Sequence, residues 1–129
     1  MTEHDLQNMI RVELSHWGTF FRANVGAGWT GNVIKKTTDG GVYIPDARPM
    51  ASGLPVGFPD LFGAVPVTIT PDMVGQTVAI FAGIEVKTPA GRVRPEQQNF
   101  IDAMRKSGCR VGVARSPEDA VKIARGDKA

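Results

Sequence analysis

The sequence predicts an α/β fold in a single domain spanning residues 1–129. Segments with helical periodicity alternate with short runs rich in β-branched and aromatic residues. The chain has 129 residues, 42% hydrophobic and 22% charged, a size and composition suited to one hydrophobic core. The expected order is α-β-β-β-α-β plus a C-terminal helix, which is typical of a sheet with helical crossovers.

Composition restricts the class of protein further. No window approaches the roughly 18 uninterrupted apolar residues of a membrane span. The acidic start, residues 1–5, lacks the basic and then apolar layout of a signal peptide, so we expect an intracellular protein without a membrane partner. One cysteine, Cys109, and two histidines cannot form a closed zinc site. Any metal should therefore be bound by oxygen.

Charge is distributed unevenly along the chain. Residues 87–129 hold ten Lys or Arg against five Asp or Glu, a net +5, whereas residues 1–86 carry a net −3. This asymmetry fits a polyanionic ligand such as nucleic acid. A solvated surface explains it equally well.

The first helix should begin after Thr2, which can form a capping box with Asp5. Its apolar stripe is Leu6, Met9, Ile10, Leu14 and Trp17. Glu13 falls on the same stripe, so its carboxylate should meet a cation, a hydrogen-bond donor or a water, unless it reaches solvent at the stripe's edge. A strand is expected over residues 19–25, stopped by Gly26.

Residues 26–57 form an irregular insertion rich in Gly and Pro. One hairpin is possible around Asp39-Gly40-Gly41. Irregular stretches of this length are usually functional or mobile. The insertion also contains Trp29, Lys35, Lys36 and Arg48, which could contact a ligand or a second subunit.

Asp60 lies where a turn becomes a short strand. Pro59 keeps its neighbour extended, and the apolar strand that follows Asp60 ends at Gly63. The alternative is that Asp60 merely caps the turn. Residues 64–69 extend this strand or begin a hairpin, and residues 71–75 form a turn or a short helical piece.

Residues 77–88 are the longest apolar run and the expected central strand, covered on both faces. Side chains alternate along a strand, so Glu85 and Lys87 share one face while Ile84 and Val86 point into packing. An ion pair on an exposed strand end is the plain alternative.

A basic loop with Arg92 and Arg94 leads to a helix over residues 95–107, which Pro95 should begin. Its apolar stripe includes a polar residue, Gln97, three positions before Phe100. A strand over 110–114 should pair in parallel with the strand 77–88. The last helix is capped by Ser116 and runs to about Arg125.

Asp60 and Glu85 can together supply hard oxygen ligands to Mg²⁺. Lys87, on the same face as Glu85, would then orient or help deprotonate a water that attacks a phosphodiester. This set of residues predicts metal-assisted phosphodiester hydrolysis.

Pro59-Asp60 followed by Glu85-Val86-Lys87 resembles the PD-(D/E)xK nuclease signature. The wider pattern resembles the virus-type replication-repair nuclease family, VRR-NUC. The stretches that carry the resemblance span most of residues 57–124. They are Gly57-Phe58-Pro59-Asp60-Leu61, Ile84-Glu85-Val86-Lys87-Thr88, Arg94-Pro95-Glu96-Gln97-Gln98-Asn99-Phe100-Ile101 and Gly112-Val113-Ala114-Arg115-Ser116-Pro117-Glu118-Asp119-Ala120.

The resemblance implies a restriction-endonuclease-like core, a central mixed β-sheet flanked by α-helices. It implies that Asp60, Glu85 and the carbonyl of Val86 hold Mg²⁺ or Mn²⁺, and that Lys87 is the catalytic lysine. Gln97 would support the site as the motif glutamine, a role for which Gln98 competes. Glu13, on the first helix, would complete the set.

The resemblance also implies a homodimeric, structure-specific endodeoxyribonuclease that cuts branched DNA, similar to Holliday-junction resolvases. It would serve replication, recombination or repair in the cytoplasm of a bacterium or a phage-infected host cell. The predicted DNA contacts are Arg92, Arg94, Lys35 and Lys36. The alternatives are a non-specific or end-directed nuclease, or a non-catalytic DNA-binding module that uses basic residues for phosphates.

Overall fold

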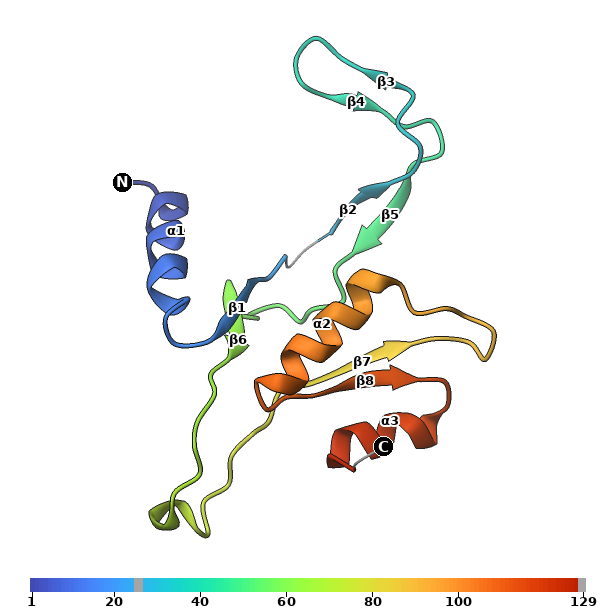
Figure 1. The fold of residues 1–129 in the computed structure, drawn as a ribbon. Coiled ribbons are helices and arrows are strands. Elements are labelled where there is room, and N and C mark those ends of the chain that lie inside the picture. The colour runs from blue at the N-terminus through green and yellow to red at the C-terminus, as the bar shows by residue number, and fades with distance from the viewer. Residues whose placement is uncertain (25–26, 128–129) are drawn as a thin grey trace. The chain divides into compact units, whose positions relative to one another are not determined.

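The computed structural model describes residues 1–24 and 27–127. In chain order the elements are α1 (Glu3–Leu14), β1 (Thr19–Arg22), β2 (Ala27–Thr30), β3 (Lys35–Lys36), β4 (Val42–Tyr43), β5 (Arg48–Ala51), β6 (Leu61–Ala64), the 3-10 helix η1 (Pro71–Met73), β7 (Ala82–Val86), α2 (Pro95–Lys106), β8 (Arg110–Ala114) and α3 (Pro117–Arg125). This mixed α/β composition, drawn in Figure 1, confirms the predicted class.

The chain divides into two compact units, one made of residues 1–20 and 63–129 and the other of residues 21–62. The strands among the described residues pair as four two-stranded sheets, β1–β6, β2–β5, β3–β4 and β7–β8. The expectation of one central mixed sheet therefore differs from the pairing within the described chain.

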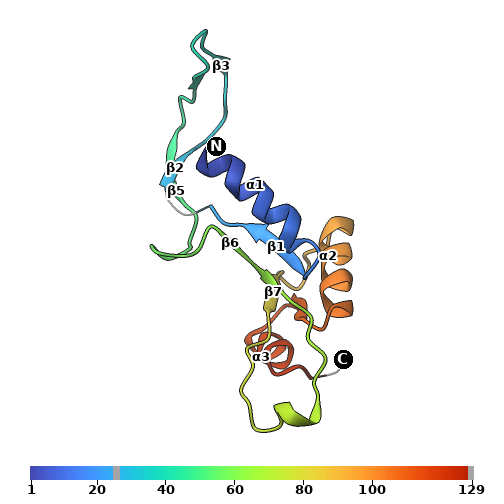
Figure 2. The same cartoon turned by 90° about the vertical axis from the view of Figure 1, so that its left-hand side faces the viewer.

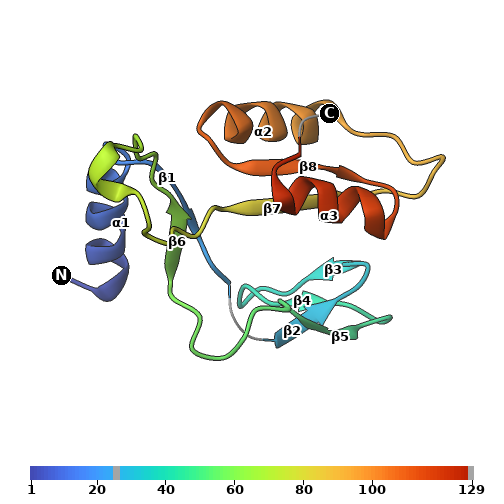
Figure 3. The ribbon, with the colours of Figure 1, turned by 90° about the horizontal axis from the view of Figure 1, so that it is seen from below.

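The β7–β8 sheet is the centre of the first unit. Its strands are parallel, with Gly83 opposite Val111, Glu85 opposite Val113 and Val86 opposite Ala114. This confirms that the strand before the crossover helix and the strand after it are parallel neighbours. Figure 3 shows the two strands side by side with α2 and α3 packed beside them.

The two later helices begin and end where the sequence predicts. Pro95 is the first residue of α2, and Gly108 follows its end with a φ of +99°, a left-handed conformation that suits glycine. Ser116 caps α3 by accepting a hydrogen bond from the Asp119 N–H at 3.1 Å. The buried core of this unit, within the described chain, consists of Ile101, Met104, Val111 and Ala114.

The first helix has the predicted cap but not the predicted packing. Thr2 and Asp5 form the capping box, and hydrogen bonding of the Asp5 carboxylate to the Thr2 backbone N–H, and secondarily to the Thr2 side chain, lowers the pKa of Asp5. No residue of α1 is buried, and Trp17, placed on its stripe by the sequence, lies beyond the helix and is 69% exposed. Of the expected strand 19–25, Thr19–Arg22 forms β1, Ala23 and Asn24 belong to no strand, and Val25 and Gly26 lie outside the described residues.

Strands β1 and β6 approach each other closely. A Cβ at Gly63 would lie 2.2 Å from the Thr19 carbonyl oxygen, and one at Gly18 would lie 2.2 Å from that of Ala64. Both positions therefore require glycine, since any side chain would force the strands apart.

The second unit contains a two-stranded ribbon. The hairpin predicted around Asp39-Gly40 is confirmed, with Lys35 opposite Tyr43 in the β3–β4 pair. The Thr37 hydroxyl and the Gly41 N–H donate to the Asp39 carboxylate and lower its pKa. The antiparallel β2–β5 pair was not predicted, because its Gly- and Pro-containing strands lack a periodic apolar signal.

The long strand predicted over residues 77–88 is wrong in its length and burial. Only Ala82–Val86 pair with a neighbour. Ile84 and Val86, expected inside, are 38% and 75% exposed. The 3-10 helix at Pro71–Met73 confirms the short helical piece, while residues 65–69 and 76–81 belong to no strand of the described chain. The β-branched residues of this run favour an extended backbone, but a β-strand also needs a neighbouring strand with which to form hydrogen bonds.

None of the helices in residues 1–24 and 27–127 combines the length and apolar character that crossing a membrane requires.

Candidate active site

Glu85 and Lys87 lie together on one face of β7, as their spacing predicts. The Lys87 Nζ is 3.5 Å from the Glu85 Oε1, and the side chains of Lys87 and Glu85 are 18% and 34% exposed. Both charges are thus partly withdrawn from water, an arrangement that costs desolvation and needs hydrogen-bonding partners.

Gln97, in the first turn of α2, supplies such a partner. Its Nε2 donates to the Glu85 Oε1 at 2.8 Å, while its Oε1 accepts the Arg94 N–H at 2.9 Å. The second bond fixes which end of the amide faces the carboxylate, because only the NH₂ end can donate. The structure therefore brings three of the predicted site residues, Glu85, Lys87 and Gln97, into one network.

Gln98, the competing glutamine, faces elsewhere. Its Nε2 donates to the Asp102 Oδ1 at 2.8 Å on the exposed side of α2. This geometry favours Gln97 as the glutamine that supports Glu85.

The other oxygen of Glu85 is open. Within the described chain no hydrogen bond to Oε2 is formed, since Gln97 donates to Oε1, the oxygen that also lies 3.5 Å from the Lys87 Nζ. A cavity of about 420 Å³ lies beside Glu85 and is also lined by Arg94, Gln97 and Phe100. Solvent or a ligand can therefore reach the carboxylate from the side of α2.

The carbonyl of Val86 faces away from β8. The Phe81 carbonyl accepts the Arg110 N–H, and the Lys87 N–H donates to the Ala114 carbonyl. In a parallel pair of strands, every second residue points both its N–H and its carbonyl toward the partner strand. Phe81 and Lys87 make such bonds to β8, so the main-chain groups of the odd-numbered residues of β7 point toward β8. The Val86 carbonyl then points to the opposite edge of β7, which no described strand covers.

Asp60 belongs to the unit of residues 21–62. It directly precedes β6, and its carbonyl accepts the Ala23 N–H at 2.9 Å. Its side chain is exposed and makes no hydrogen bond to another described residue. The neighbouring Phe62 ring packs against Phe21 and Phe58, with centroid distances of 5.6 Å and 5.3 Å. The turn that presents Asp60 is therefore fixed by a local aromatic cluster.

Glu13 is exposed on α1 and has no hydrogen-bond or ion-pair partner in the described chain. Of the two predictions for this residue, the structure shows the one in which the carboxylate reaches solvent.

Among the described residues no group of three or more His, Cys, Asp or Glu side chains gathers to hold a metal. The predicted ligand set consists of two carboxylates and one main-chain carbonyl.

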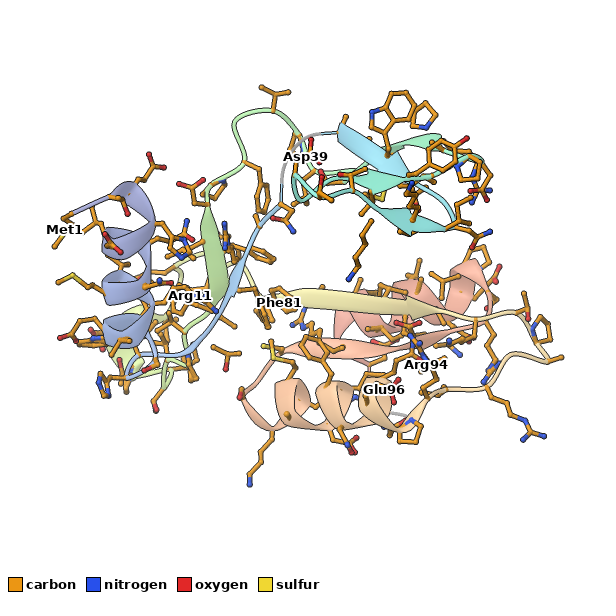
Figure 4. All side chains as sticks on the ribbon, turned by 90° about the horizontal axis from the view of Figure 1, so that it is seen from above. Met1, Arg11, Asp39, Phe81, Arg94 and Glu96 are labelled. Carbon is orange, nitrogen blue, oxygen red and sulfur yellow. The ribbon has the colours of Figure 1, made fainter. Side chains whose placement is uncertain are left out.

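The predicted DNA-binding residues are all exposed. Arg92 lies in the loop before α2, and Lys35 and Lys36 form β3 of the ribbon. The Arg94 Nε lies 3.6 Å from the Glu96 Oε1, and the two side chains are 67% and 69% exposed. Figure 4 shows Arg94 and Glu96 at the start of α2. Such an exposed pair is weak, so Arg94 can exchange Glu96 for another anion.

Sequence reasoning missed Arg115, which follows β8. Its Nη1 donates to the carbonyls of Thr88 and Gly91 at 2.7 Å each, and to that of Pro89 at 3.4 Å. These bonds hold the loop that joins Lys87 to α2. The available signal was topological: parallel strands end at the same edge of a sheet, so an arginine after β8 lies near the loop after β7.

Comparison with protein families finds one match, and it covers the stretch that contains these residues. The model of the VRR-NUC domain matches residues 48–118, which are 71 of the 129 residues and include Asp60, Glu85, Lys87 and Gln97. No curated protein and no solved structure matches the chain. Because the match covers more than half of the sequence, the chain belongs to the VRR-NUC family, whose domain is a nuclease of the PD-(D/E)xK type.

Proposed function

We propose that this nuclease is a metal-dependent, structure-specific endodeoxyribonuclease that cuts branched DNA, with four-way junctions as its main substrate. It would act in replication, recombination or repair in the cytoplasm of a bacterium or a phage-infected cell. Membership of the VRR-NUC family supports the nuclease activity. The observation that carries the proposal is the partly buried Glu85–Lys87–Gln97 network.

Asp60, Glu85 and the Val86 carbonyl would hold Mg²⁺ or Mn²⁺ within a restriction-endonuclease-like core. The residues on β7 fit a hard cation, because the Glu85 Oε2 accepts no hydrogen bond within the described chain and the Val86 carbonyl faces a strand edge that no described strand covers. When bound, the ion would stabilise negative charge on the scissile phosphate and lower the pKa of the attacking water.

The protein's own side chains would position the reactants. Gln97 holds the Glu85 Oε1, so that Oε2 would be the oxygen that binds the metal. Lys87 would orient the attacking water through its ammonium group and stabilise the charge that develops on the phosphate oxygens. Glu13, on α1, would complete the set of acidic residues around the substrate.

DNA would be bound by Arg92 and Arg94 beside the site and by Lys35 and Lys36 on the ribbon. One site cuts one strand, so paired cuts across a junction require two copies of the chain. A two-fold homodimer supplies them most simply.

Cleavage of end-labelled DNA in Mg²⁺ tests the proposal, with a four-way junction, a flap and a linear duplex compared at equal concentration. We expect paired, symmetric nicks in the junction and slow cutting of the duplex. Equal rates on all three would contradict structure specificity, and binding without cleavage would indicate a DNA-binding module.

The Asp60→Asn variant tests the metal ligand. It should abolish cleavage and leave junction binding largely unchanged. Asp102→Asn, which alters an exposed aspartate on α2, is the matched control and should cut at the wild-type rate.

A further inference from the structure

A cavity beside β8 is a feature that the proposed reaction does not use. Its volume is about 680 Å³, within the range of cavities that bind small ligands. Residues of α2, β8, α3 and the loop after β7 line this β8 cavity. Figures 2 and 3 show β8 between the two helices. Among the described strands only β7 pairs with β8, so the other edge of β8 is open.

The lining of the β8 cavity is basic. Its four cations are Arg105 on α2, Arg110 at the start of β8, Arg115 after the end of β8, and Lys122 on α3. Two acids, Asp119 and Asp127, also line it, so four positive and two negative charges leave a net +2. The four cations belong to the ten Lys and Arg of residues 87–129. The fold therefore gathers part of the charge asymmetry of the sequence into one cavity.

Both acids of the lining already have partners. The Asp127 Oδ2 lies 2.6 Å from the Arg125 Nη2, and the Asp119 Oδ2 accepts the Arg115 N–H at 2.9 Å. Within residues 1–24 and 27–127 no carboxylate forms an ion pair with any of the four cations. Their positive charges therefore have no counter-ion in the part of the chain that the structure describes.

Main-chain carbonyls hold the three arginines in place. The hydrogen bonds run from the Arg105 Nε to Val111 at 2.7 Å, from the Arg110 Nη1 to Ala124 at 3.0 Å, and from the Arg115 Nη1 to Thr88 and Gly91 at 2.7 Å each. A neutral carbonyl positions a guanidinium but leaves its positive charge uncompensated. Each guanidinium has five N–H donors, so each keeps donors for a ligand. The arginines are therefore ordered before any ligand binds.

This arrangement suits a phosphate that carries an organic group. Like charges gathered in one cavity repel one another, and a bound anion removes that repulsion. A guanidinium can donate two parallel hydrogen bonds to a phosphate, whose geometry it matches. Val93 and Ile123 line the same cavity, so its wall can also contact the sugar or base beside the phosphate.

The loop after β7 connects the β8 cavity with the candidate active site. Val93 lines the β8 cavity, and the next residue, Arg94, lines the cavity beside Glu85. Arg115 lines the β8 cavity and donates to two carbonyls of this same loop. Adjacent residues are only about 3.8 Å apart, so a nucleic-acid strand that contacts Arg94 can also reach the β8 cavity.

We propose that the β8 cavity binds a backbone phosphate of the DNA strand, beyond the phosphate that is cut. The four cations hold this second phosphate, and the strand between the two sites passes the loop with Arg92 and Arg94. The cations call only for a phosphate group. Its assignment to DNA rests on the proposed function, because the neighbouring site is the one assigned to DNA cleavage.

The salt dependence of DNA binding tests the β8 cavity without cleavage. Fluorescence anisotropy of a labelled four-way junction in Ca²⁺ gives the slope of log affinity against log salt. Arg105→Gln combined with Lys122→Gln removes two of the four charges and should reduce the slope by about 0.9, the value for one phosphate contact. Arg105→Lys combined with Lys122→Arg should keep the wild-type slope, because it preserves both charges.

A matched control removes one arginine and one lysine elsewhere. Arg11, on α1, and Lys106, next to Arg105 on α2, are exposed and do not line the β8 cavity. Arg11→Gln combined with Lys106→Gln should leave the slope unchanged. Lys122→Gln alone breaks no side-chain hydrogen bond of the described chain and should also lower the slope, so the test does not depend on the bond from Arg105 to Val111.

Isothermal titration calorimetry with inorganic phosphate distinguishes DNA from a free anion. A site for free phosphate would give saturable heat that the doubly neutralised cavity variant loses, together with equal DNA slopes in that variant and the wild type. This result would overturn the assignment to DNA.

An unchanged slope in cavity variants that melt at the wild-type temperature would overturn the proposal, and so would an equal loss in the matched control or in the charge-preserving pair. A reduced slope in a protein that cuts no DNA would preserve the site and refute the proposed activity. Junction cleavage together with an unchanged slope would refute the site alone. The two failures can therefore be told apart.

Discussion

On β7 the charged side chains are less exposed than the apolar ones, which is the reverse of what most strands show. On one face the charged side chains of Lys87 and Glu85 are only 18% and 34% exposed. On the other face the apolar residues Ile84 and Val86 are 38% and 75% exposed. In most strands the charged side chains would face water and the aliphatic ones would be buried.

This difference indicates what each face is for. A lysine and a glutamate in water would gain little from pairing, and withdrawing them from water carries a cost. Here Gln97, from the first turn of α2, donates a hydrogen bond that holds the Glu85 carboxylate. The charged face thus has the partly buried, hydrogen-bonded arrangement that the proposed catalytic role requires, while the side chain of Val86, 75% exposed, contributes little to the fold.

The largest expected change is in the cleavage rate, and it should follow a substitution on the charged face of β7 but not one on the apolar face. Lys87→Ala removes the ammonium from the charged face and should lower the single-turnover cleavage rate at least about a hundredfold, the usual scale for losing one group that stabilises the charge of the transition state. Junction affinity should change little. Val86→Ala, one residue away on the other face, keeps the main-chain carbonyl and should cut within about twofold of the wild-type rate.

Rapid-quench measurement of strand cleavage, with binding followed in Ca²⁺, distinguishes these outcomes. Full activity of Lys87→Ala, or equal losses in both variants, would refute the distinction between the faces.

A smaller effect should follow from Gln97→Ala, which leaves Glu85 in place but removes its hydrogen bond. Loss of a group that orients a metal ligand typically costs about 10- to 100-fold in metal affinity or activity, so we expect a reduction of that size. Gln98→Ala is the matched control, since its amide contacts Asp102 rather than Glu85.

Titration of cleavage against Mg²⁺, together with the melting temperature, checks the role of Gln97. A raised Mg²⁺ requirement at an unchanged melting temperature supports it. Loss of activity only in proportion to loss of stability would instead assign Gln97 to the packing of α2.

The smallest effect concerns the loop after β7. Arg92→Ala combined with Arg94→Ala should weaken DNA binding and reduce the slope of log affinity against log salt by about 1.8, if each arginine contacts one phosphate. Lys106→Ala, an exposed lysine at the other end of α2, should leave the slope unchanged. Fluorescence anisotropy at several salt concentrations measures it, and an unaltered slope in the double variant would exclude this loop from the DNA interface.

Elements with their own end signals could be predicted from the sequence. Thr2 with Asp5, Pro95 and Ser116 each begin a helix where expected, because a cap depends on residues within one turn. The parallel β7–β8 pair also follows from local information, since the helix between the two strands requires a crossover.

Features that depend on distant partners could not be predicted in this way. The strand over residues 77–88 forms its ladder only at Ala82–Val86, where β8 is available. Alternation showed that Glu85 and Lys87 share a face, but the helix that covers this face decides which side is inside. The β2–β5 pair could not be predicted for the same reason, because its two strands are separated in the sequence by the whole of the β3–β4 hairpin.

The residues of the candidate site also differ in whether the sequence alone could predict their contacts. Gln97 could be singled out because it is a polar residue on the apolar stripe of its helix and matches the motif glutamine of the family, and the structure places its amide within hydrogen-bond distance of Glu85. Arg115 was missed because its contacts with Thr88 and Gly91 cross from one strand end to another. The roles of Asp60 and Glu13 stay predictions, since each carboxylate is exposed and without a partner in the described chain.

Anomalous diffraction from crystals grown with Mn²⁺ tests the central claim most directly. We expect one Mn²⁺ at about 2.1 Å from the carboxylates of Asp60 and Glu85 and from the Val86 carbonyl, with Gln97 still bonded to the Glu85 Oε1. Mn²⁺ bound elsewhere, or its absence from Glu85 at saturating concentration, would refute the proposed metal site.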